Sequence, residues 1–340
     1  MSASAQTATP LRPAGPFELL LYHRPEEQPF IEQMADAIER CAATNPRLQV
    51  KLHLACTETA ARAVVSGVEA AYGFLPVPVF NAATKLRWLA CPQAGPDPAF
   101  YHAALVDSDV VVTNVRGIYG DHISAHIMAY VLSFARALPT YQTQQREHLW
   151  QSGAQTRFLP DCTAVIIGLG GIGDAAARRC ADFGMRVLAV DPRVSDKPAH
   201  VQGLVPPAQM LEVVGEADFV IVTAPETPHT RGLFDAGFFR AMRHEAFFIN
   251  IGRGATVRLR DLDEALRAGT IAGAALDVFE VEPLPRDHPL WDAPNMLITP
   301  HSASDGPHLD ERRIAVLVEN CRRFGLGEPL RNVVDKSNWF

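Results

Sequence analysis

Residues 164–174 read Ala-Val-Ile-Ile-Gly-Leu-Gly-Gly-Ile-Gly-Asp, an aliphatic strand that runs directly into a glycine-rich turn. The alanine-rich stretch from Asp174 to Phe183 is expected to form a helix straight after the turn, and Asp191 closes the next aliphatic run. A strand, three spaced glycines, a helix and then an acidic residue are the fingerprint of a βαβ unit that binds a dinucleotide. The stretch therefore predicts a doubly wound parallel sheet with a coenzyme site at this turn.

Each glycine of the turn has a physical role. Gly168 allows the tight turn, Gly170 lets the backbone approach a pyrophosphate, and Gly173 permits close packing of the helix on the strand. The N-terminus of the helix favours the negative charge of the phosphates. Gly171 and Ile172, which open the helix, are therefore predicted coenzyme contacts as well.

Asp191 bears on which coenzyme is bound. Its carboxylate is expected to accept hydrogen bonds from the adenosine ribose hydroxyls and to repel the 2′-phosphate of NADP, which favours NAD. Arg193 lies two residues further on and could neutralise such a phosphate. NAD is therefore expected, with NADP as the alternative.

The coenzyme turn belongs to a longer alternation of short aliphatic runs with amphipathic stretches, which is typical of parallel sheets built from βαβ units. The first predicted set of strands covers Phe17–Tyr22, Leu48–Leu54, Glu69–Phe74, Leu86–Ala90 and Val110–Thr113. The second predicted set covers Ala164–Ile167, Arg186–Val190, Phe219–Val222, Phe247–Ile251, Gly273–Leu276 and Met296–Thr299.

Three further stretches have helical patterns. Asp121–Leu138 is apolar at helical spacing and beyond one face, which predicts a long connecting helix that also serves as a dimer seam. Pro139–Trp150 is polar and is expected to be a shorter helix. Leu309–Phe324 is expected to be the last helix, followed by an irregular tail.

Length and charge narrow the classes of function. The chain has 340 residues, of which 48% are hydrophobic and 20% charged, and this length fits a globular protein of about two domains. A formal net charge of −7 provides no large positive field for nucleic acid or an anionic membrane surface. No apolar run approaches the roughly 20 residues of a membrane span. A small-molecule partner is therefore expected, with neither nucleic acid nor a membrane.

The cysteines and the first residues bear on location. The six cysteines lie far apart, mostly in apolar surroundings, which indicates reduced thiols, a cytoplasmic location and no zinc site. Residues 1–16 are rich in Ala, Thr and Pro and lack the basic start and apolar core of a signal peptide. They are predicted to be a disordered leader.

Three successive strands of the second set are followed by residues suited to one reaction. Arg253 follows the fourth strand, and His301 follows the sixth. Two carboxylates, Glu280 and Glu282, follow the fifth. Because the carboxyl ends of parallel strands meet at one edge of the sheet, these side chains are expected to converge where a nicotinamide would lie.

The residue types match the oxidation of a 2-hydroxy acid. Removing hydride from C2 leaves a carbonyl, so a base must take the hydroxyl proton, and histidine suits this task near neutral pH. A carboxylate beside the imidazole favours its protonated form and fixes its orientation. A guanidinium can bind the substrate carboxylate with two hydrogen bonds and polarise the neighbouring carbonyl.

With these residues in view, the chain resembles the D-isomer-specific 2-hydroxyacid dehydrogenase family over roughly residues 17–335. The motifs that carry the resemblance are Gly168-Leu-Gly-Gly-Ile-Gly173, Asn250-Ile-Gly-Arg-Gly254, Leu276-Asp-Val-Phe-Glu-Val-Glu-Pro283, Pro289-Leu-Trp291 and Ile298-Thr-Pro-His301. The likeness continues through Ala94-Gly95, Val112-Thr-Asn-Val-Arg-Gly117 and Leu330-Arg-Asn-Val-Val334.

The resemblance implies an α/β fold of two Rossmann-like, doubly wound parallel-sheet domains. One is a flavodoxin-like substrate domain, expected over residues 17–112 and 302–340. The other is an inserted NAD-binding domain, expected over residues 113–301.

The resemblance also assigns roles to residues. Arg253 would bind substrate, His301 would be the acid/base, and Glu282 would be the partner of His301 in preference to Glu280. Asp277 would face the nicotinamide amide. The remaining residues expected to contact ligands are Thr223, Pro225 and Ile251 on the coenzyme, and the backbone amides of Ala94 and Gly95 on the substrate carboxylate.

The function expected from this resemblance is reversible, NAD(H)-linked interconversion of a small D-2-hydroxy acid and its 2-oxo acid, with glyoxylate, hydroxypyruvate or larger 2-oxo acids as substrates. The alternative from another class is a coenzyme-sensing corepressor-like interaction protein, because such proteins of the family keep the catalytic residues. Within the enzymes, Glu282 argues against a formate dehydrogenase, which is expected to carry Gln there. Phosphoglycerate dehydrogenases often have a further C-terminal regulatory domain, and a short form of that enzyme stays open.

One departure from the family pattern lies on the connecting helix, where many relatives have Val-Ala-Glu-His and this chain has Ile123-Ser-Ala-His126. The change touches no residue of the proposed chemistry. His122 and His126 are four residues apart on the helix and could form half of a metal site, but no third ligand is evident. A helix-surface or interface role is favoured, and no metal is expected.

Overall fold

The computed structural model describes residues 11–96, 98–193 and 197–337, and the chain divides into two compact units. Unit 1 comprises residues 1–118 and 307–340, and unit 2 comprises residues 119–306. Unit 2 is therefore continuous in sequence and lies between the two segments of unit 1. Among the described residues, no helix combines the length and the apolar character needed to cross a membrane.

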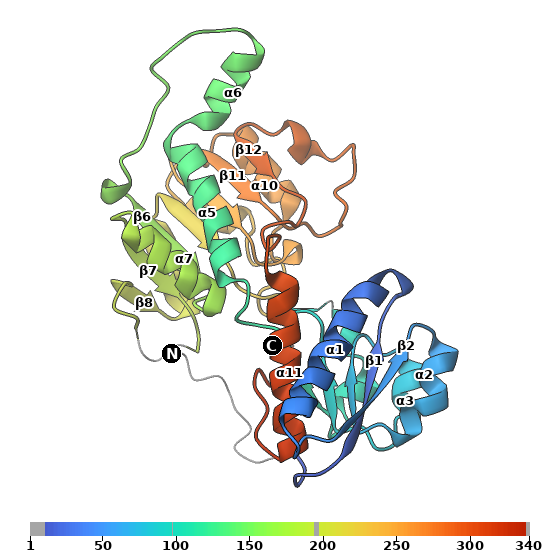
Figure 1. Ribbon diagram of the computed structural model, residues 1–340. Helices are drawn as coiled ribbons and strands as arrows, with labels where there is room; N and C mark the ends of the chain where they lie inside the picture. Colours follow the sequence, from blue (N-terminus) through green and yellow to red (C-terminus); the bar gives the residue numbers. More distant parts are fainter. Residues whose placement is uncertain (1–10, 97, 194–196, 338–340) are drawn as a thin grey trace. The chain divides into compact units, whose positions relative to one another are not determined.

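Unit 1 is a parallel α/β sheet with the strand order β2-β1-β3-β4-β5 (Figure 1). This order is that of flavodoxin-like folds. Its strands are β1 (Phe17–Tyr22), β2 (Val50–Ala55), β3 (Ala70–Tyr72), β4 (Trp88–Ala90) and β5 (Val111–Thr113). Its helices are α1 (Gln28–Thr44), α2 (Glu58–Val64), α3 (Val77–Ala82), α4 (Ala103–Val106) and α11 (Leu309–Leu326).

The last helix is part of the core of unit 1. Phe324 of α11 packs edge-on to Phe17 of β1, with 5.0 Å between ring centroids, and lies 5.4 Å from the ring of Trp88. All three side chains are almost completely buried. The first sheet therefore buries one face only when residues from both ends of the chain come together.

Part of the segment expected to be a disordered leader is ordered. Leu11 packs against the core of unit 1, and the guanidinium of Arg12 lies over the rings of Phe17 and Phe324. The amide of Gly15 donates to the carbonyl of Gly325. These apolar and cation–π contacts hold residues 11–16, while residues 1–10 lie outside the described part of the chain.

Unit 2 is a larger parallel sheet, ordered β12-β11-β10-β9-β6-β7-β8. Its strands are β6 (Thr163–Ile167), β7 (Arg186–Val190), β8 (Gly203–Val205), β9 (Phe219–Val222), β10 (Phe247–Asn250), β11 (Gly273–Leu276) and β12 (Met296–Ile298). Its helices are α5 (Gly120–Ala135), α6 (Leu138–Arg146), α7 (Gly171–Asp182), α8 (Met210–Val214), α9 (Ala236–Ala241) and α10 (Leu259–Arg267). The strand order reverses direction between β6 and β9, and this switch point is where such folds bind ligands.

The boundaries between the units fall later than the sequence suggested, after Ile118 and Gly306 instead of after residues 112 and 301. Residues 113–118 stay with unit 1 because the tail of the chain pairs with them. The amide of Asn114 donates to the carbonyl of Asn332, and the guanidinium of Arg116 donates to the carbonyl of Val333.

The connecting helix is shorter than expected. It ends at Ala135, because Ala137 takes a left-handed backbone conformation with φ 53°, and α6 begins at Leu138. Figure 1 shows α6 standing apart from the sheet of its own unit. None of the residues of α6 is buried.

Candidate active site

The glycine-rich turn joins β6 to α7 in a geometry that requires glycine at two positions. Gly168 has φ 97°, and a Cβ on it would lie 2.7 Å from the amide nitrogen of Ala224. A Cβ on Gly173 would lie 2.0 Å from the carbonyl oxygen of Gly168. Both distances are too short for real atoms, so any larger residue would push the helix away from the sheet.

The space before the helix fits a phosphate group. A Cβ built on Gly170 or Gly171 meets no atom of the described structure within 4 Å. Gly170 is the N-cap of α7, so the first amides of the helix point towards this space without acceptors in their own helix. Open space in front of unpaired amides is what an anionic pyrophosphate needs, and Ile172 lies in the same first turn.

The other residues expected to line the coenzyme lie at the carboxyl ends of the neighbouring strands. Thr223 follows β9, and its hydroxyl donates to the carbonyl of Gly168 at 2.6 Å, which ties that strand end to the turn. Pro225 follows in the same loop. Ile251 follows β10 and is buried.

The carboxylate of Asp191 is hydrogen-bonded to the glycine-rich turn and to the backbone of Arg193. Its Oδ2 accepts the amide of Leu169, and its Oδ1 accepts the amide of Arg193, both at 2.8 Å. The guanidinium Nε of Arg193 lies 3.7 Å from Oδ1. The carboxylate side chain is only 2% exposed. Its hydrogen bond to the amide of Leu169 stabilises the glycine-rich turn.

Arg253 is held by a loop that packs tightly against its neighbours. A Cβ on Gly254 would lie 1.8 Å from the carbonyl carbon of Phe279, and one on Gly252 would lie 2.4 Å from the carbonyl oxygen of Ala224. The backbone on both sides of Arg253 is therefore fixed by close approach.

Arg253 is half-buried, and its guanidinium donates to the carbonyl of Gly252 at 2.7 Å. Burial lowers the pKa of Arg253, whereas the carboxylates of Glu282 and Glu226 raise it. An arginine retains its charge under such opposing effects, so the site keeps a cation beside Glu282.

His301 and Glu282 form a pair at the ends of β12 and β11. The Nδ1 atom of His301 lies 2.7 Å from Oε2 of Glu282, and Oε1 of Glu282 accepts the amide of Phe279 at 2.8 Å. An ionised carboxylate accepts the Nδ1 proton, which leaves Nε2 as the ring nitrogen that exchanges protons. Glu280, the competing carboxylate, is exposed and lines a separate cavity.

Asp277 lies beneath this pair and is 1% exposed. Its Oδ1 accepts the amide of Ser302 and its Oδ2 accepts the amide of Ala303, both at 2.9 Å. The hydroxyl of Thr299 also donates to Oδ1. The carboxylate expected at the nicotinamide amide is thus already bound to the turn that carries His301.

Thr299 joins this cluster to helix α5, which sequence reasoning did not foresee. Its hydroxyl contacts the hydroxyl of Tyr130 and lies 3.1 Å from Nε2 of His126. The sequence signal for such a cluster is polar residues one helical turn apart on an otherwise apolar helix, but the pair considered as half of a metal site is His122 and His126, and Tyr130 is not among the predicted site residues. Within the described ranges, no group of three or more His, Cys, Asp or Glu side chains is placed to hold a metal ion.

Ala94 and Gly95 belong to unit 1, where they follow β4 in a partly exposed loop. The side-chain amide of Asn114 donates to the carbonyl of Ala94 at 2.8 Å. This bond holds the loop to the residues that follow the neighbouring strand β5.

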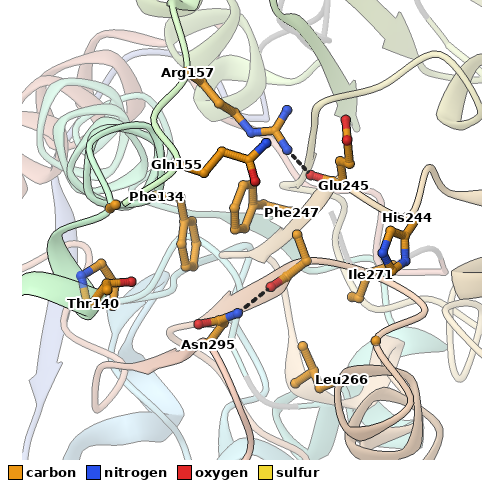
Figure 2. Close-up of a pocket in the computed structure, with 14 residues that line it drawn as sticks. Phe134, Thr140, Gln155, Arg157, His244, Glu245, Phe247, Leu266, Ile271 and Asn295 are labelled. Carbon is orange, nitrogen blue, oxygen red and sulfur yellow. Dashed lines mark hydrogen bonds between the residues drawn. The ribbon is translucent and has the colours of Figure 1, made fainter. Parts of the chain in front are cut away.

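A cavity of about 440 Å³ lies near the amino ends of strands β10 and β12 in unit 2, away from the predicted site residues (Figure 2). Phe247 at the start of β10 stacks on Phe134 of α5, with ring centroids 4.3 Å apart, and the guanidinium of Arg157 lies over the Phe247 ring. Asn295, before β12, donates to the carbonyl of Ala272. None of the predicted site residues lines this cavity, because they lie at the carboxyl ends of the strands.

Comparison with known proteins agrees with this geometry. The family described as "D-isomer specific 2-hydroxyacid dehydrogenase, NAD binding domain" matches residues 128–303. The chain is similar to a glyoxylate reductase/hydroxypyruvate reductase of Mus musculus, at 36% identity over 73% of this chain and 77% of that protein. It is also similar to a D-3-phosphoglycerate dehydrogenase of Archaeoglobus fulgidus, at 34% identity over 76% of this chain and 49% of that protein. The chain thus spans about half the length of the phosphoglycerate dehydrogenase.

A solved structure of similar fold extends the likeness to both units. It is a D-isomer specific 2-hydroxyacid dehydrogenase from Xanthobacter autotrophicus Py2 in complex with NADPH and MES. The TM-score is 0.80 at 30% identity, with 96% of this chain and all of that chain covered. With the match of the NAD-binding domain, these likenesses lead to one conclusion: the chain belongs to the D-isomer specific 2-hydroxyacid dehydrogenase family.

Proposed function

We propose that the protein reduces a small 2-oxo acid to the D-2-hydroxy acid with a nicotinamide coenzyme, and catalyses the reverse oxidation. The observation that carries the proposal is the 2.7 Å contact between His301 and Glu282, at the same strand ends as Arg253 and the glycine turn. Related enzymes named glyoxylate or hydroxypyruvate reductase support this direction of the reaction.

In the proposed mechanism each residue has one task. Bound coenzyme supplies the hydride to C2 of the substrate. Arg253 binds the substrate carboxylate and polarises the adjacent carbonyl. His301 donates the Nε2 proton to the carbonyl oxygen as the hydroxyl forms, and Glu282 stabilises the imidazolium that precedes this transfer. The amides of Ala94 and Gly95 are proposed to hold the substrate carboxylate from unit 1.

For the coenzyme, we propose binding on the turn from Gly168 to Gly173 with a preference for NAD(H). Thr223, Pro225, Ile251 and Asp277 are assigned to the nicotinamide end, and Asp191 to the adenosine ribose. This preference is supported by the buried Asp191 carboxylate, whose negative charge is expected to repel the extra phosphate of NADP. Arg193 beside it and the NADPH in the Xanthobacter structure keep NADP as the alternative.

The experiment that tests the function is a substrate panel. Purified protein is mixed with NADH or NADPH and with glyoxylate, hydroxypyruvate, pyruvate or a branched or aromatic 2-oxo acid, and absorbance of the reduced coenzyme is followed. The expected result is substrate-dependent loss of absorbance with at least one acid. No loss with any acid, at high enzyme concentration, would contradict the proposal and favour a coenzyme-sensing interaction protein, which gains no support from the relatives named above.

We also propose that the protein works as a homodimer. Helix α6 has nine residues and buries none of them, and so short a helix is marginal in water by itself. The segment after it exposes Leu149, Trp150 and Phe158, with Trp150 104% exposed. A second copy of the chain packed on residues 138–158 would stabilise the short helix and cover the exposed apolar side chains. Light scattering should give the dimer mass for the native protein and a smaller mass for a variant with Trp150→Ser and Phe158→Ser.

A cytoplasmic location completes the proposal. All six cysteines are free thiols. An oxidising compartment tends to pair such thiols, whereas the cytoplasm keeps them reduced. Detection of the tagged protein in the cytoplasmic fraction tests this location.

A further inference from the structure

The hydroxyl of Thr299 lies at the centre of a hydrogen-bond cluster that no assigned role explains. It contacts the carboxylate of Asp277, the hydroxyl of Tyr130 and, at 3.1 Å, Nε2 of His126. All of these residues belong to unit 2, and Tyr130 and His126 lie one turn apart on α5 with their rings edge-on at 4.8 Å.

Chemistry fixes the direction of each bond. A hydroxyl has one proton to donate and two lone pairs to accept with. The Asp277 carboxylate already accepts two backbone amides, so Thr299 donates to it. Tyr130 O–H and His126 Nε2–H must then both donate to Thr299. Burial raises the pKa of Tyr130, so its proton stays in place at any pH at which the enzyme would work. The Thr299 hydroxyl therefore makes all three of the hydrogen bonds that it can make, one as donor and two as acceptor.

The cluster ends on the turn that carries His301. The backbone amide of His301 donates to the carbonyl of Asp277 at 2.8 Å, while the next two amides, those of Ser302 and Ala303, donate to the Asp277 carboxylate. His301 itself has a left-handed backbone with φ 52°, which is unfavourable for a residue with a Cβ. Three consecutive amides bound to one aspartate hold the turn in this conformation.

We propose that Thr299 and Tyr130, with His126, are positioning residues that act through Asp277 to keep the His301 imidazole at Glu282. The proposal rests on His301 being the acid/base of the proposed reaction. Removal of the Thr299 hydroxyl takes this acceptor from the Tyr130 hydroxyl and from His126 Nε2, which then has Asp277 Oδ1 at 4.0 Å, and removes one of the hydrogen bonds that the Asp277 carboxylate accepts. The His301 turn then samples other conformations, and the ring meets Glu282 less often.

The main variant is Thr299→Val, which keeps the shape and removes the hydroxyl. The expected rise in the barrier of the chemical step is the free energy of losing one hydrogen-bond partner, so kcat should fall roughly 10- to 100-fold. The Kd for NADH should rise only a few-fold, because the change reaches the coenzyme only through Asp277 and leaves the Gly168–Gly173 turn, which is proposed to bind the pyrophosphate, untouched. Thr299→Ser retains the hydroxyl and should restore most of kcat.

The matched control is Thr163→Val on β6. Thr163 is a buried threonine of the same unit, whereas Thr299 is half-buried, and the Thr163 hydroxyl makes no side-chain hydrogen bond within the described chain. This variant should keep kcat within about twofold. Equal kcat for Thr299→Val and the native protein, or a failure of Thr299→Ser to recover activity, would overturn the proposal.

A double variant tests whether Tyr130 acts through Thr299. Tyr130→Phe alone should lower kcat several-fold. In the Thr299→Val background it should add less than twofold, because the acceptor that it serves is already gone. If the two substitutions lower kcat by factors that multiply in the double variant, Tyr130 does not act through Thr299 and the proposal is contradicted.

Two measurements on the free protein separate this inference from the proposed function. Exchange of the Ser302 and Ala303 amides should speed up about tenfold or more in Thr299→Val and stay unchanged in Thr163→Val. The ring ¹⁵N shifts of His301, at a pH where the ring is neutral, should show one dominant Nδ1–H tautomer in the native protein and a mixture in Thr299→Val. If the native protein reduces no 2-oxo acid, the proposed function fails, whereas unchanged exchange and shifts would defeat the positioning cluster by itself.

Discussion

Oε1 of Glu282 accepts the amide of Phe279 while Oε2 lies 2.7 Å from Nδ1 of His301. The carboxylate is thereby fixed by its own strand end before it meets the imidazole. Because the hydrogen bond from the Phe279 amide to Oε1 decides where Oε2 points, the orientation of the His301 ring depends on the end of β11 as well as on the end of β12.

The first prediction concerns this pair. His301→Ala should lower kcat by about two to four orders of magnitude, because the carbonyl oxygen loses its proton donor. Glu282→Gln should cost less, about one to two orders, because glutamine keeps a hydrogen bond to the ring without the negative charge. Stopped-flow turnover with NADH measures both, and coenzyme fluorescence should report unchanged NADH binding. Turnover of His301→Ala at the native rate would show that another group is the acid.

Arg253 is expected to act mainly in substrate capture. Arg253→Ala removes the cation that pairs with the substrate carboxylate, so kcat/KM should fall by roughly two to three orders of magnitude, with most of the change in KM. Arg253→Lys should recover only part of the loss, since one ammonium cannot make the same paired hydrogen bonds. Steady-state kinetics with the best acid of the panel provides the measurement. An unchanged KM would remove Arg253 from substrate binding.

Asp191 links coenzyme choice to the shape of the turn. Asp191→Ala should shift the ratio of kcat/KM for NADH over NADPH towards NADPH by about tenfold or more, because the charge that opposes the 2′-phosphate disappears. It should also weaken binding of both coenzymes, because the amide of Leu169 loses its acceptor. Titration with each coenzyme separates the two effects. A constant ratio would leave Asp191 with the structural role alone.

The fourth prediction concerns acid stability of unit 1. Arg322 of α11 donates to the carboxylates of Glu319 and Glu328, and these bonds lower the pKa of both acids below the ordinary value of 4.5. Acids whose pKa is lowered by folding stabilise the folded state above that value, and the contribution is lost as the pH falls through the folded-state pKa. Because these side chains are partly exposed, the network contributes only about 1 kcal/mol.

Arg322→Ala should therefore lower the thermal midpoint at pH 7 by a few degrees, and the difference from the native protein should shrink at pH 3. The control is Arg178→Ala, which breaks an exposed ion pair with Asp174 on α7 of unit 2. This control should change the midpoint little at either pH. A difference that persists at pH 3 would show that Arg322 stabilises through packing instead of charge.

The sequence predicts the sheets well because their strands are aliphatic on both faces. The bounds of β1, β7, β9 and β11 agree with the predicted ranges to the residue. It does not show β8, because Gly203–Val205 is a three-residue edge strand that is half-buried along its length. The break between α5 and α6 falls a few residues before the predicted division at Leu138 and Pro139, because Ala137 takes a left-handed conformation and alanine carries no turn signal.

For the site, motifs identify the residue types but not their partners. His301 and Glu282 meet as predicted, because their strand ends are neighbours. The predicted partners of the Asp191 and Asp277 carboxylates are the ribose and the nicotinamide amide of the coenzyme. In the structure both carboxylates accept hydrogen bonds from backbone amides of their own unit. Tyr130 and Thr299 lie 169 residues apart, and no local pattern indicates a bond over such a separation.

The burial of α11 among Phe17 and Trp88 has a consequence for how the protein is made. Residues 119–306 are continuous and carry the whole core of unit 2, so they can fold while residues 307–340 are still on the ribosome. The first sheet remains incomplete, with one apolar face covered only in part by α1, until the segment around Phe324 has emerged. The part of the protein synthesised first is therefore the last to be completed, and chaperones are expected to bind that exposed face, which a translation product without α11 would leave exposed.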